Sequence, residues 1–338
     1  MTKPFIRAVR EDDFEDLVAL AQKSGGGMTN LPARPDGLQR RIEIALESYA
    51  AKATKPGPEM YILVLEVGGV VRGTSAIFST VGNEHGFVNY RINRTMQVST
   101  ELGKKGERRL LTPTHDFTGA AEVGSLFLDP SERGGGLGKL VARSRYLFIA
   151  QRPEIFAETL IAELRGWRAP DGGQPFWDAL GRQFFDMDFE EADAHNAANG
   201  NQFIADLMPP YPIYVALLPK EARDSIGKPH DNGKGAVELL EREGFRYDGY
   251  IDVFDGGPVF SVATNKVRTL AESQTAPVCD IVDHIEGRPT SLAAAGVLST
   301  FRSARAVMKE TDGGVVLDAE SADALNVTTG DFVRWTKW

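Results

Sequence analysis

Along the first part of the chain, the spacing of hydrophobic residues alternates between that of a strand and that of a helix. This spacing predicts a mixed order of strands and helices. Residues 5–9 are typical of a strand, and residues 11–24 place apolar side chains at the spacing of an amphipathic helix that should end at Gly25-Gly26-Gly27. Residues 38–51 repeat the helical spacing. The apolar segments 61–67 and 70–81 flank Gly68-Gly69, which predicts a hairpin.

The rest of the chain continues to mix the two kinds of element. Strands are predicted over residues 87–94, 121–128, 160–164 and 250–254, and helices over residues 137–151, 176–181 and 236–243. From about residue 265 the apolar stretches become short and strand-like, which predicts a small β-rich C-terminal domain. Elements mixed in this way favour the α/β class of folds.

The segment between the strand 121–128 and the helix 137–151 carries the clearest chemical signal. It has the pattern R-x-x-G-x-G, which is formed by Arg133, Gly134, Gly135, Gly136, Leu137 and Gly138, and Lys139 follows it. Glycines let a backbone approach an anion closely, and the amides and dipole at the start of a helix attract phosphate. The expected ligand is therefore a pyrophosphate, with Arg133 and Lys139 adding positive charge.

Other glycine-rich loops fit this segment less well. A Walker A loop needs a Ser or Thr after Gly-Lys for Mg²⁺, whereas Leu140 follows Gly138-Lys139. The dinucleotide fingerprint G-x-G-x-x-G requires another spacing and lies in the first strand-to-helix turn of its fold. A glycine turn that only caps a helix remains an alternative.

The R-x-x-G-x-G loop after Leu126-Phe127-Leu128-Asp129-Pro130 resembles the coenzyme A loop of the GCN5-related N-acyltransferase superfamily. The resemblance implies a mixed β-sheet, flanked by helices, that splays open between the strand before the loop and the strand after the helix. The pantetheine arm of the cofactor would lie along the strand that holds Leu126. The implied domains are residues 1–260, with an insertion at about 182–235, and a small β-rich domain over residues 261–338.

Composition and charge narrow the class of protein further. The 338 residues include 38 basic and 47 acidic side chains, and the net charge of −9 argues against nucleic acid as a partner and suits a cationic substrate. Cys279 is the single cysteine, so no disulfide forms within the chain, which suits a reducing cytoplasm. The sequence shows no signal-peptide core, no apolar run of membrane-spanning length and no close histidine spacing for a metal.

Longer segments resemble the arginine N-succinyltransferase family, in order from residue 23 to residue 258. Among them are Asn89-Tyr90-Arg91, Ala162-Glu163-Leu164-Arg165-Gly166, Glu243-Gly244-Phe245-Arg246-Tyr247 and Lys23-Ser24-Gly25-Gly26-Gly27-Met28-Thr29-Asn30-Leu31-Pro32. This family transfers a succinyl group from succinyl-CoA to the α-amine of L-arginine, the first step of an arginine degradation route. The resemblance implies N2-succinyl-L-arginine and coenzyme A as products, with succinyl-CoA as a co-substrate and no permanently bound cofactor.

Two residues take roles from this resemblance. The succinyl-CoA-contacting leucine of the family falls on Leu126, and its proton-donor histidine falls on His230, although the segment around His230 departs from the family pattern. A histidine near its reference pKa of about 6.5 can either accept the proton of the ammonium or donate one to the leaving thiolate.

The distal carboxylate of the succinyl group and the guanidinium of L-arginine each need a partner of opposite charge. Arg91, and after it Arg165, are candidates for the distal carboxylate of the succinyl group, because arginine binds carboxylates with two hydrogen bonds. An ordinary surface ion pair explains either arginine equally well. Glu122, Asp252 and Asp255 are candidates for the guanidinium of L-arginine, although acids at strand ends more often serve turns and caps.

Two alternatives to an arginine succinyltransferase stay open. The same fold could use another acyl-CoA or another amine, such as ornithine, or the chain could be a catalytically silent subunit that binds coenzyme A beside a paralogous partner. The presence of both the loop and His230 speaks against the silent subunit. A cytoplasmic protein that forms a homo-oligomer or pairs with a paralogous subunit is expected.

Overall fold

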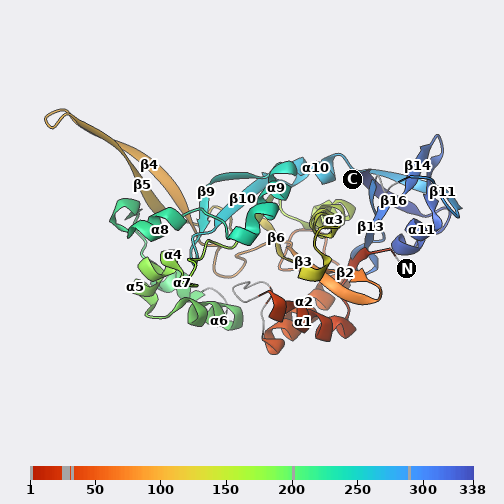
Figure 1. Cartoon of the computed structure of the whole chain (residues 1–338), viewed down its shortest axis with the longest axis horizontal. Coiled ribbons are helices and arrows are strands. Elements are labelled where there is room, and N and C mark those ends of the chain that lie inside the picture. Colours follow the sequence, from red (N-terminus) through yellow and green to blue (C-terminus); the bar gives the residue numbers. More distant parts are fainter. Residues whose placement is uncertain (1–2, 25–30, 32–33, 200–201, 288–290) are drawn as a thin grey trace. The chain divides into compact units, whose positions relative to one another are not determined.

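The computed structural model describes residues 3–24, 31, 34–199, 202–287 and 291–338 and is shown in Figure 1. The predicted helix stop at Gly25-Gly26-Gly27 lies outside the described residues. The chain forms two compact units. Unit 1 comprises Met1–Ser79, Val123–Glu158 and Ala263–Trp338, and unit 2 comprises Thr80–Glu122 and Thr159–Val262.

The apolar segments at the start of the chain form the strands of unit 1 that were predicted for them. β1 (Phe5–Ala8) pairs antiparallel with β2 (Met60–Val67), which pairs antiparallel with β3 (Val70–Phe78). The turn between β2 and β3 needs glycine, because Gly68 and Gly69 have φ angles of 60° and 83°. Helices α1 (Phe14–Lys23) and α2 (Pro35–Ala50) bury their apolar faces on β3 and β2.

The second segment of unit 1 links a strand to a helix. Strand β6 (Ala121–Leu128) leads through a short 3₁₀ turn, η2 (Pro130–Glu132), into helix α3 (Leu137–Gln151). Most of α3 is buried, including Leu140, Leu147 and Phe148. The pattern of strand, glycine loop and helix matches the bounds that the sequence predicts.

The C-terminal segment completes the sheet of unit 1. Strand β13 (Arg302–Ala306) pairs antiparallel with β1, joining Phe5 to Ala304. The strand order in this unit is β14-β15-β11-β16-β12-β13-β1-β2-β3-β6. The remaining elements are β11 (Gln274–Val282), β12 (Ser291–Ala295), β14 (Met308–Thr311), β15 (Gly314–Asp318), β16 (Phe332–Lys337), α10 (Arg268–Ala271) and α11 (Ala319–Leu325).

Unit 2 is a mixed sheet with short helices. Its strand order is β7-β10-β9-β4-β5-β8, and Trp177 and Tyr90 lie in its buried core. The strands are β4 (Asn89–Ser99), β5 (Lys104–Thr114), β7 (Thr159–Glu163), β8 (Ile213–Tyr214), β9 (Arg246–Asp252) and β10 (Pro258–Ala263). The helices are α4 (Pro175–Ala179), α5 (Gly181–Phe185), α6 (Phe189–Asn199), α7 (Gln202–Leu207), α8 (Lys220–Ser225) and α9 (Lys234–Arg242).

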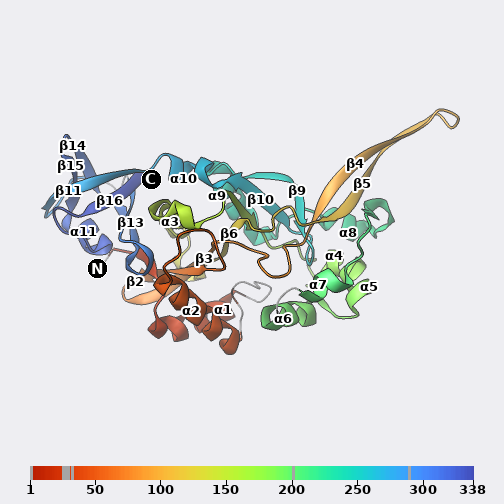
Figure 2. The ribbon, with the colours of Figure 1, turned by 180° about the vertical axis from the view of Figure 1, so that it is seen from behind.

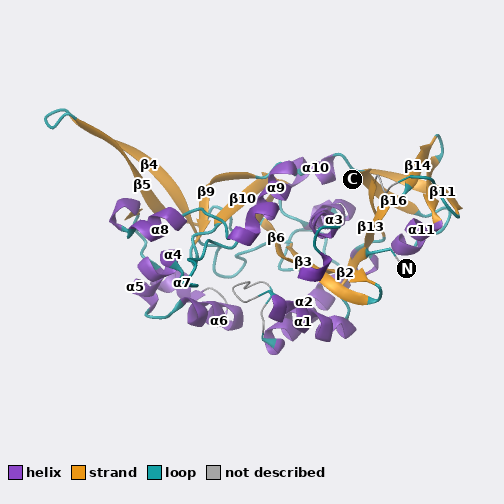
Figure 3. Ribbon diagram, in the orientation of Figure 1, coloured by secondary structure: helices purple, strands orange, loops and turns teal. Residues whose placement is uncertain are grey.

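The hairpin of β4 and β5 forms a long arm on unit 2. Pairing runs without interruption from Asn89 opposite Thr114 to Ser99 opposite Lys104. The arm extends away from the helices of unit 2 in both views, Figure 1 and Figure 2. Figure 3 shows that helices α4, α5, α7 and α8 gather near its base. The sequence predicted only the first part of β4, and β5 was not predicted.

The predicted α/β class, with a mixed sheet flanked by helices and a β-rich C-terminal segment, is confirmed. β6 and β7 pair in parallel at Ala121–Leu160 and Glu122–Ile161. The predicted opening of the sheet beyond this point stays a prediction, as does the domain boundary near residue 260 with its insertion at about 182–235.

Candidate active site

The glycine loop of unit 1 has the backbone that an anion site needs. Gly134 and Gly136 have φ angles of 97° and 80°, which only glycine adopts readily. Gly136 is the N-cap of α3, and its carbonyl accepts a hydrogen bond from the amide of Leu140 at 3.1 Å. The first amides of a helix have no partner within the helix, and a helix N-terminus of this kind is suited to binding an anion.

Asp129 fixes the entrance to this loop. Its Oδ1 accepts from the amide and the hydroxyl of Ser131 at 3.0 and 2.8 Å, and its Oδ2 lies 2.6 Å from Nζ of Lys23. The bond from Lys23, followed by the Ser131 amide, lowers the pKa of Asp129 to about 2. The carboxylate therefore stays ionised at neutral pH and holds the turn that precedes Arg133.

Cationic side chains from β13 and α3 lie beside the loop within unit 1, and the loop itself contributes Arg133. Arg305 of β13 donates a hydrogen bond to the carbonyl of Gly135 at 3.0 Å, and its guanidinium lies 4.8 Å from the ring of Trp338. Nζ of Lys139 lies 4.4 Å from the same ring. Arg133 is exposed. The sequence pointed to Arg133 and Lys139 but missed Arg305, because β13 follows the loop by about 170 residues and no local pattern joins them.

Leu126 lies on β6, where its side chain is half-buried. Its neighbour Ser125 is buried and has a φ of 51°, a left-handed conformation that costs a non-glycine residue about 1–3 kcal/mol. Such local strain is found most often at ligand sites. The predicted role of Leu126 in contacting an acyl-CoA stays a prediction.

His230 lies in unit 2, and two backbone hydrogen bonds join its segment to residues 165–167. Its amide donates to the carbonyl of Arg165 at 2.8 Å, and the amide of Trp167 donates to the carbonyl of Lys228 at 2.9 Å. Nδ1 of His230 accepts a hydrogen bond from the amide of Asn232 at 3.2 Å. The ring proton of the neutral imidazole therefore sits on Nε2, which becomes a hydrogen-bond donor.

The charge state of His230 follows from its surroundings. Partial burial, followed by the positive charges of Arg165 and Arg168, lowers the pKa of His230 below its ordinary value. The imidazole is therefore neutral at neutral pH. Arg165 is itself half-buried, and burial together with Arg168 lowers its pKa. The structure thus brings His230 and Arg165, two of the predicted residues, close together.

A cluster of acids surrounds the end of β7 in unit 2. Glu163 accepts a hydrogen bond from Nδ2 of Asn89 at 3.0 Å. Burial, followed by the charges of Asp252 and Glu122, raises the pKa of Glu163 well above its ordinary value. Carboxyl groups that raise one another's pKa cannot all ionise easily, so the cluster binds protons more readily than isolated acids do. The sequence pointed to Glu122, Asp252 and Asp255 but missed Glu163, because it ends an apolar strand and resembles an ordinary strand-end polar residue.

Asp252 and Asp255 are both tied to backbone amides. Asp252 Oδ1 accepts from Phe254 at 2.7 Å and from Asp255 at 2.9 Å, and Asp255 accepts from Gly166 at 2.6 Å and from Gly257 at 2.8 Å. Burial, followed by the charge of Asp255, raises the pKa of Asp252 to about 8, and burial also raises that of Asp255. Both acids therefore shape the turn after β9 and also belong to the cluster.

Arg91, the first candidate for the distal carboxylate, lies on β4. Its side chain is 51% exposed, its Nη1 lies 3.9 Å from Oδ2 of Asp116, and its guanidinium lies 5.2 Å from the ring of Tyr250. This arrangement is that of a surface ion pair over an aromatic ring. Its predicted role stays a prediction.

We also searched the part of the chain that the structure describes for a metal site, a reactive cysteine and a membrane-spanning helix. Within the described ranges, no group of three or more His, Cys, Asp or Glu side chains could hold a metal ion. Cys279 is exposed and has a free thiol. None of the described helices is both long and apolar enough to cross a bilayer.

A mixed sheet whose strand β6 delivers a glycine loop to the N-terminus of α3 defines an N-acyltransferase that uses an acyl-CoA. The chain matches the family model of the arginine N-succinyltransferase beta subunit over residues 4–269, and the model of its C-terminal domain over residues 274–337. The chain belongs to the arginine N-succinyltransferase beta subunit family. The predicted family is thereby confirmed.

Individual relatives cover almost the whole chain. The arginine N-succinyltransferase subunit beta of Pseudomonas aeruginosa is 38% identical over 330 residues, which is 97% of this chain and 96% of the relative. The arginine N-succinyltransferase of Escherichia coli is 38% identical over 337 residues, with the same coverage. The solved structure of arginine/ornithine succinyltransferase subunit AI from P. aeruginosa has a TM-score of 0.88 and 33% identity, and covers 100% of this chain and 99% of that one.

Proposed function

We propose that this chain transfers the succinyl group of succinyl-CoA to the α-amine of L-arginine, which gives N2-succinyl-L-arginine and coenzyme A. The observation that carries the proposal is the left-handed backbone of Gly134 and Gly136 at the N-terminus of α3, in a chain of this family. That backbone presents amides to the diphosphate of the carrier. No permanently bound cofactor takes part.

The reaction forms one carbon–nitrogen bond and breaks one carbon–sulfur bond. The neutral α-amine attacks the thioester carbonyl, the tetrahedral intermediate collapses, and the thiolate leaves. In the net reaction one proton moves from the amine nitrogen to the sulfur. His230 presents Nε2–H as a hydrogen-bond donor, so it stabilises negative charge that develops on the oxygen or the sulfur, while the proton released by the amine reaches the thiolate through solvent.

The acid cluster of Glu122, Glu163, Asp252 and Asp255 gives unit 2 a preference for a cationic substrate. A guanidinium offers five N–H donors in a planar fork, and carboxylates accept them in pairs. A bound guanidinium would also supply the positive charge that a group of buried carboxyls lacks. This chemistry fits the side chain of L-arginine.

The proposal also covers the compartment and the assembly in which the chain acts. The single cysteine suits the reducing cytoplasm, where acyl-CoA thioesters are available. The P. aeruginosa relative is called a subunit, so we propose that this chain acts either as a homo-oligomer or beside a paralogous subunit.

One assay tests the proposal. Purified chain is mixed with L-arginine and with either succinyl-CoA or acetyl-CoA, free thiol is followed, and the product mass is measured. Thiol release with the mass of succinylarginine supports the proposal. Release only with acetyl-CoA, or no release with either thioester, contradicts it, and the last result favours a catalytically silent subunit.

L-ornithine is the second candidate for the amine. The solved structural relative is called an arginine/ornithine succinyltransferase subunit, and both amino acids carry a cationic side chain. Ornithine is shorter and ends in an ammonium group. The same assay with L-ornithine gives the ratio of kcat/KM for the two amines, and a ratio in favour of ornithine would replace arginine in the proposal.

A further inference from the structure

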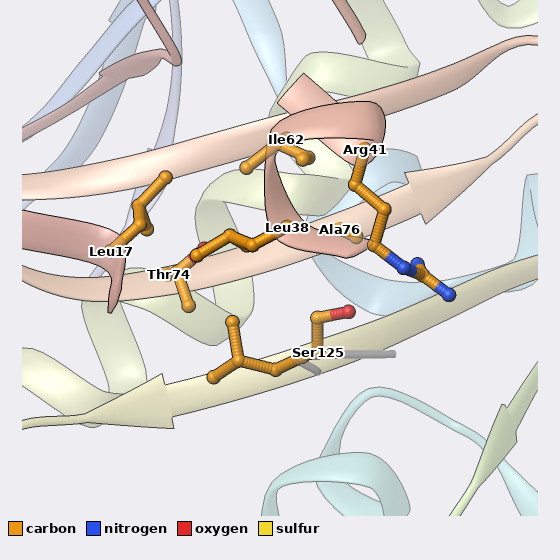
Figure 4. A pocket seen from close by; sticks show the side chains of 8 residues that line it. Leu17, Leu38, Arg41, Ile62, Thr74, Ala76 and Ser125 are labelled. Carbon is orange, nitrogen blue, oxygen red and sulfur yellow. The ribbon is translucent and has the colours of Figure 1, made fainter. Parts of the chain in front are cut away.

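The pocket of unit 1 that Figure 4 shows is too small for a substrate. It lies between α1, α2 and the strands β2, β3 and β6, and Leu17, Leu38, Ile62 and Ala76 form its apolar walls. It has room for about one water molecule. The acids around the end of β7 in unit 2 are therefore the stronger candidates for a contact with a substrate.

One buried atom beside these acids lacks a hydrogen bond. Asn89 is 0% exposed, and within the described residues its Oδ1 has no hydrogen-bond partner. Its Nδ2, on the same carboxamide, donates to Oε1 of Glu163 at 3.0 Å. A buried acceptor without a partner is destabilising, so a function that requires this side chain would explain it. The unpaired carbonyl belongs to the very group that holds Glu163 in the acid cluster.

The backbone fixes Asn89 from both sides. It lies opposite Thr114 of β5 and opposite Asp252 of β9. β4 and β7 are not neighbours in the strand order β7-β10-β9-β4, so strand pairing alone does not require the bond to Glu163. The chain therefore keeps Asn89 turned toward Glu163 although the carbonyl oxygen of Asn89 stays unpaired.

Glu163 differs from the other acids of the cluster in what its oxygens bind. Asp252 and Asp255 each accept hydrogen bonds from two backbone amides and so hold the turn after β9. Glu122 is only 4% exposed, whereas Glu163 is half-buried. In the described part of the chain, the bond that Glu163 accepts comes from Asn89 and uses Oε1. Glu163 is therefore the acid of this cluster that is best able to contact a ligand.

The charge state of Glu163 depends on the acids beside it. Burial, followed by the charges of Asp252 on β9, Glu122 on β6 and Asp255 on the turn after β9, raises the pKa of Glu163 well above its ordinary value. The nearest positive charge to this group of acids comes from Arg165, which acts on Asp255. The carboxyl of Glu163 therefore holds a proton more readily than an isolated glutamate does. A cation in place of that proton would leave the carboxyl ionised and paired.

We infer that Asn89 positions the carboxyl of Glu163 to accept hydrogen bonds from the cationic side chain of the amino-acid substrate, and that the bound cation displaces the proton of Glu163 into solvent. The inference rests on the proposed function and names the residues of unit 2 that would distinguish a guanidinium from a neutral group of the same shape. Glu163 is then the group that contacts the substrate, and Asn89 is a positioning residue.

L-Citrulline is the probe for this contact, because it matches L-arginine in shape but carries a neutral ureido group. Calorimetric titrations of the purified chain with each amino acid, at pH 7 with coenzyme A present, give the ratio of the two affinities. Wild type should bind L-arginine about 10- to 100-fold more tightly, the range expected for hydrogen bonds to a charged group. Glu163→Gln should lose most of this preference. Glu107→Gln on β5, where the acid is exposed and pairs with Arg94, should keep it.

The protons released on binding give a readout that a purely structural role of Glu163 would not change. L-Arginine should release more protons than L-citrulline, which appears as a larger difference between the heats measured in phosphate and in Tris buffer. The two amino acids share the same α-ammonium group, so its contribution cancels. In Glu163→Gln the two amino acids should release equal numbers of protons.

Asn89→Leu tests the positioning. It removes both the donor to Glu163 and the unpaired carbonyl at a similar side-chain volume, and it should weaken the binding of L-arginine by about 3- to 10-fold. The weakening should be smaller at pH 8 than at pH 7, because the hydrogen bond from Asn89 lowers the pKa of Glu163 and its loss matters less where the carboxyl is ionised. Asn93→Leu is the control, since Asn93 on the same strand donates to Thr112 at 2.8 Å and should keep wild-type affinity.

These titrations need no turnover, so failure of the inference and failure of the proposed function can be told apart. If wild type succinylates L-arginine but binds L-citrulline equally well, or if Glu163→Gln keeps the preference, the inference is wrong and the function stands. If Asn89→Leu binds L-arginine as Asn93→Leu does, the positioning role of Asn89 is wrong. If wild type shows no turnover but its preference for L-arginine depends on Glu163, the site stands and the proposed function is wrong.

Discussion

The backbone amide of Asn232 donates a hydrogen bond to Nδ1 of His230. This contact distinguishes between the two roles that the sequence allowed for the imidazole, acceptor of a proton or donor. Protonation of Nδ1 would break the contact and place two N–H groups against each other. The neighbouring Arg165 and Arg168 add to the cost of an imidazolium. The local geometry therefore favours a hydrogen bond donated by Nε2–H over acceptance of a proton at Nδ1.

Replacing His230 tests this role. His230→Gln should lower kcat by at least about tenfold, because it displaces the Nε2–H donor, and losing one donor to transition-state charge typically costs about 10²–10³-fold. His85→Gln, at a surface histidine that faces Glu84, is the control. For wild type, kcat/KM divided by the neutral fraction of the L-arginine α-amine should stay level near neutral pH and fall only at pH values below the ordinary histidine pKa, because the lowered pKa keeps His230 neutral. Near-normal turnover in His230→Gln would remove this residue from the mechanism.

Asp252 should make stability depend on pH. Its pKa of about 8 in the folded chain exceeds the unfolded value of about 3.9, so the folded state binds more protons between these values. The free energy of unfolding should therefore fall as pH rises through this window. Asp252→Asn keeps the acceptor for the amides of Phe254 and Asp255 and should flatten this dependence in urea titrations at pH 5 and pH 8.

A second acid on the same strand serves as the control for Asp252. Asp248 lies on β9 and is exposed. Asp248→Asn should leave the pH dependence of unfolding unchanged. An equal change in both variants would show that the burial of Asp252 does not set the slope.

Among the elements, the junction of β6 with α3 is the one that the sequence predicted in full. Its signal is local, since an apolar strand, four nearby glycines and an amphipathic helix follow one another within about 30 residues. The β4–β5 arm was largely missed for the opposite reason. Its outer part, including Met96 and Val98, is exposed, so no buried face imposes an alternating pattern of apolar residues.

Gly136→Ala tests the loop as an element. A φ of 80° costs an alanine about 1–2 kcal/mol, although the atoms nearest to an added Cβ lie at an ordinary 3.5 Å. The variant should be less stable by about this amount, and it should bind CoA more weakly in calorimetry because the amides of α3 are displaced. Gly235→Ala in α9, where nothing lies within 4 Å of the added Cβ, should keep wild-type CoA affinity and stability or gain slightly. Unchanged CoA affinity in Gly136→Ala would contradict the role of the loop.

The candidate site as a whole could be predicted only in part. His230 and Leu126 came from resemblance, and Glu122, Asp252 and Asp255 from their place at strand ends. Asn89 and Glu163 meet through a hydrogen bond between β4 and the end of β7, which are separated by 74 residues. Arg305 is likewise brought to the glycine loop by a hydrogen bond to Gly135, which lies 170 residues away in the chain. No pattern within a single sequence predicts which residues from distant segments come into contact.

On the scale of the whole molecule, charge and exposure predict how copies associate. Residues 89–114 of the arm carry six basic and two acidic side chains, whereas the chain has a net charge of −9. Met96, Val98 and Leu102 near its tip are 57%, 63% and 66% exposed. A basic arm with an apolar tip complements the acidic surface of a second copy. We therefore expect the arm to contact another copy of this chain.

Light scattering after gel filtration tests this expectation. The double variant Val98→Glu with Leu102→Glu should shift the mass towards that of the single chain, because two buried charges would oppose the contact. Phe332→Glu replaces an equally exposed residue, at 64%, on β16 and should keep the wild-type mass. A wild-type chain that is monomeric at all concentrations would rule out self-association through the arm.

The pairing of β1 with β13 has a consequence for synthesis. These strands lie almost 300 residues apart in the chain, and at about 5–20 residues per second the ribosome needs roughly 15–60 s to make the intervening segment. Unit 2 ends at Val262 and can fold earlier. The edge of β1 that pairs with β13 stays unpaired until β13 has been synthesised. Nascent chains of this protein should therefore depend on chaperones that shield unit 1, the half that carries the glycine loop, until translation is nearly over.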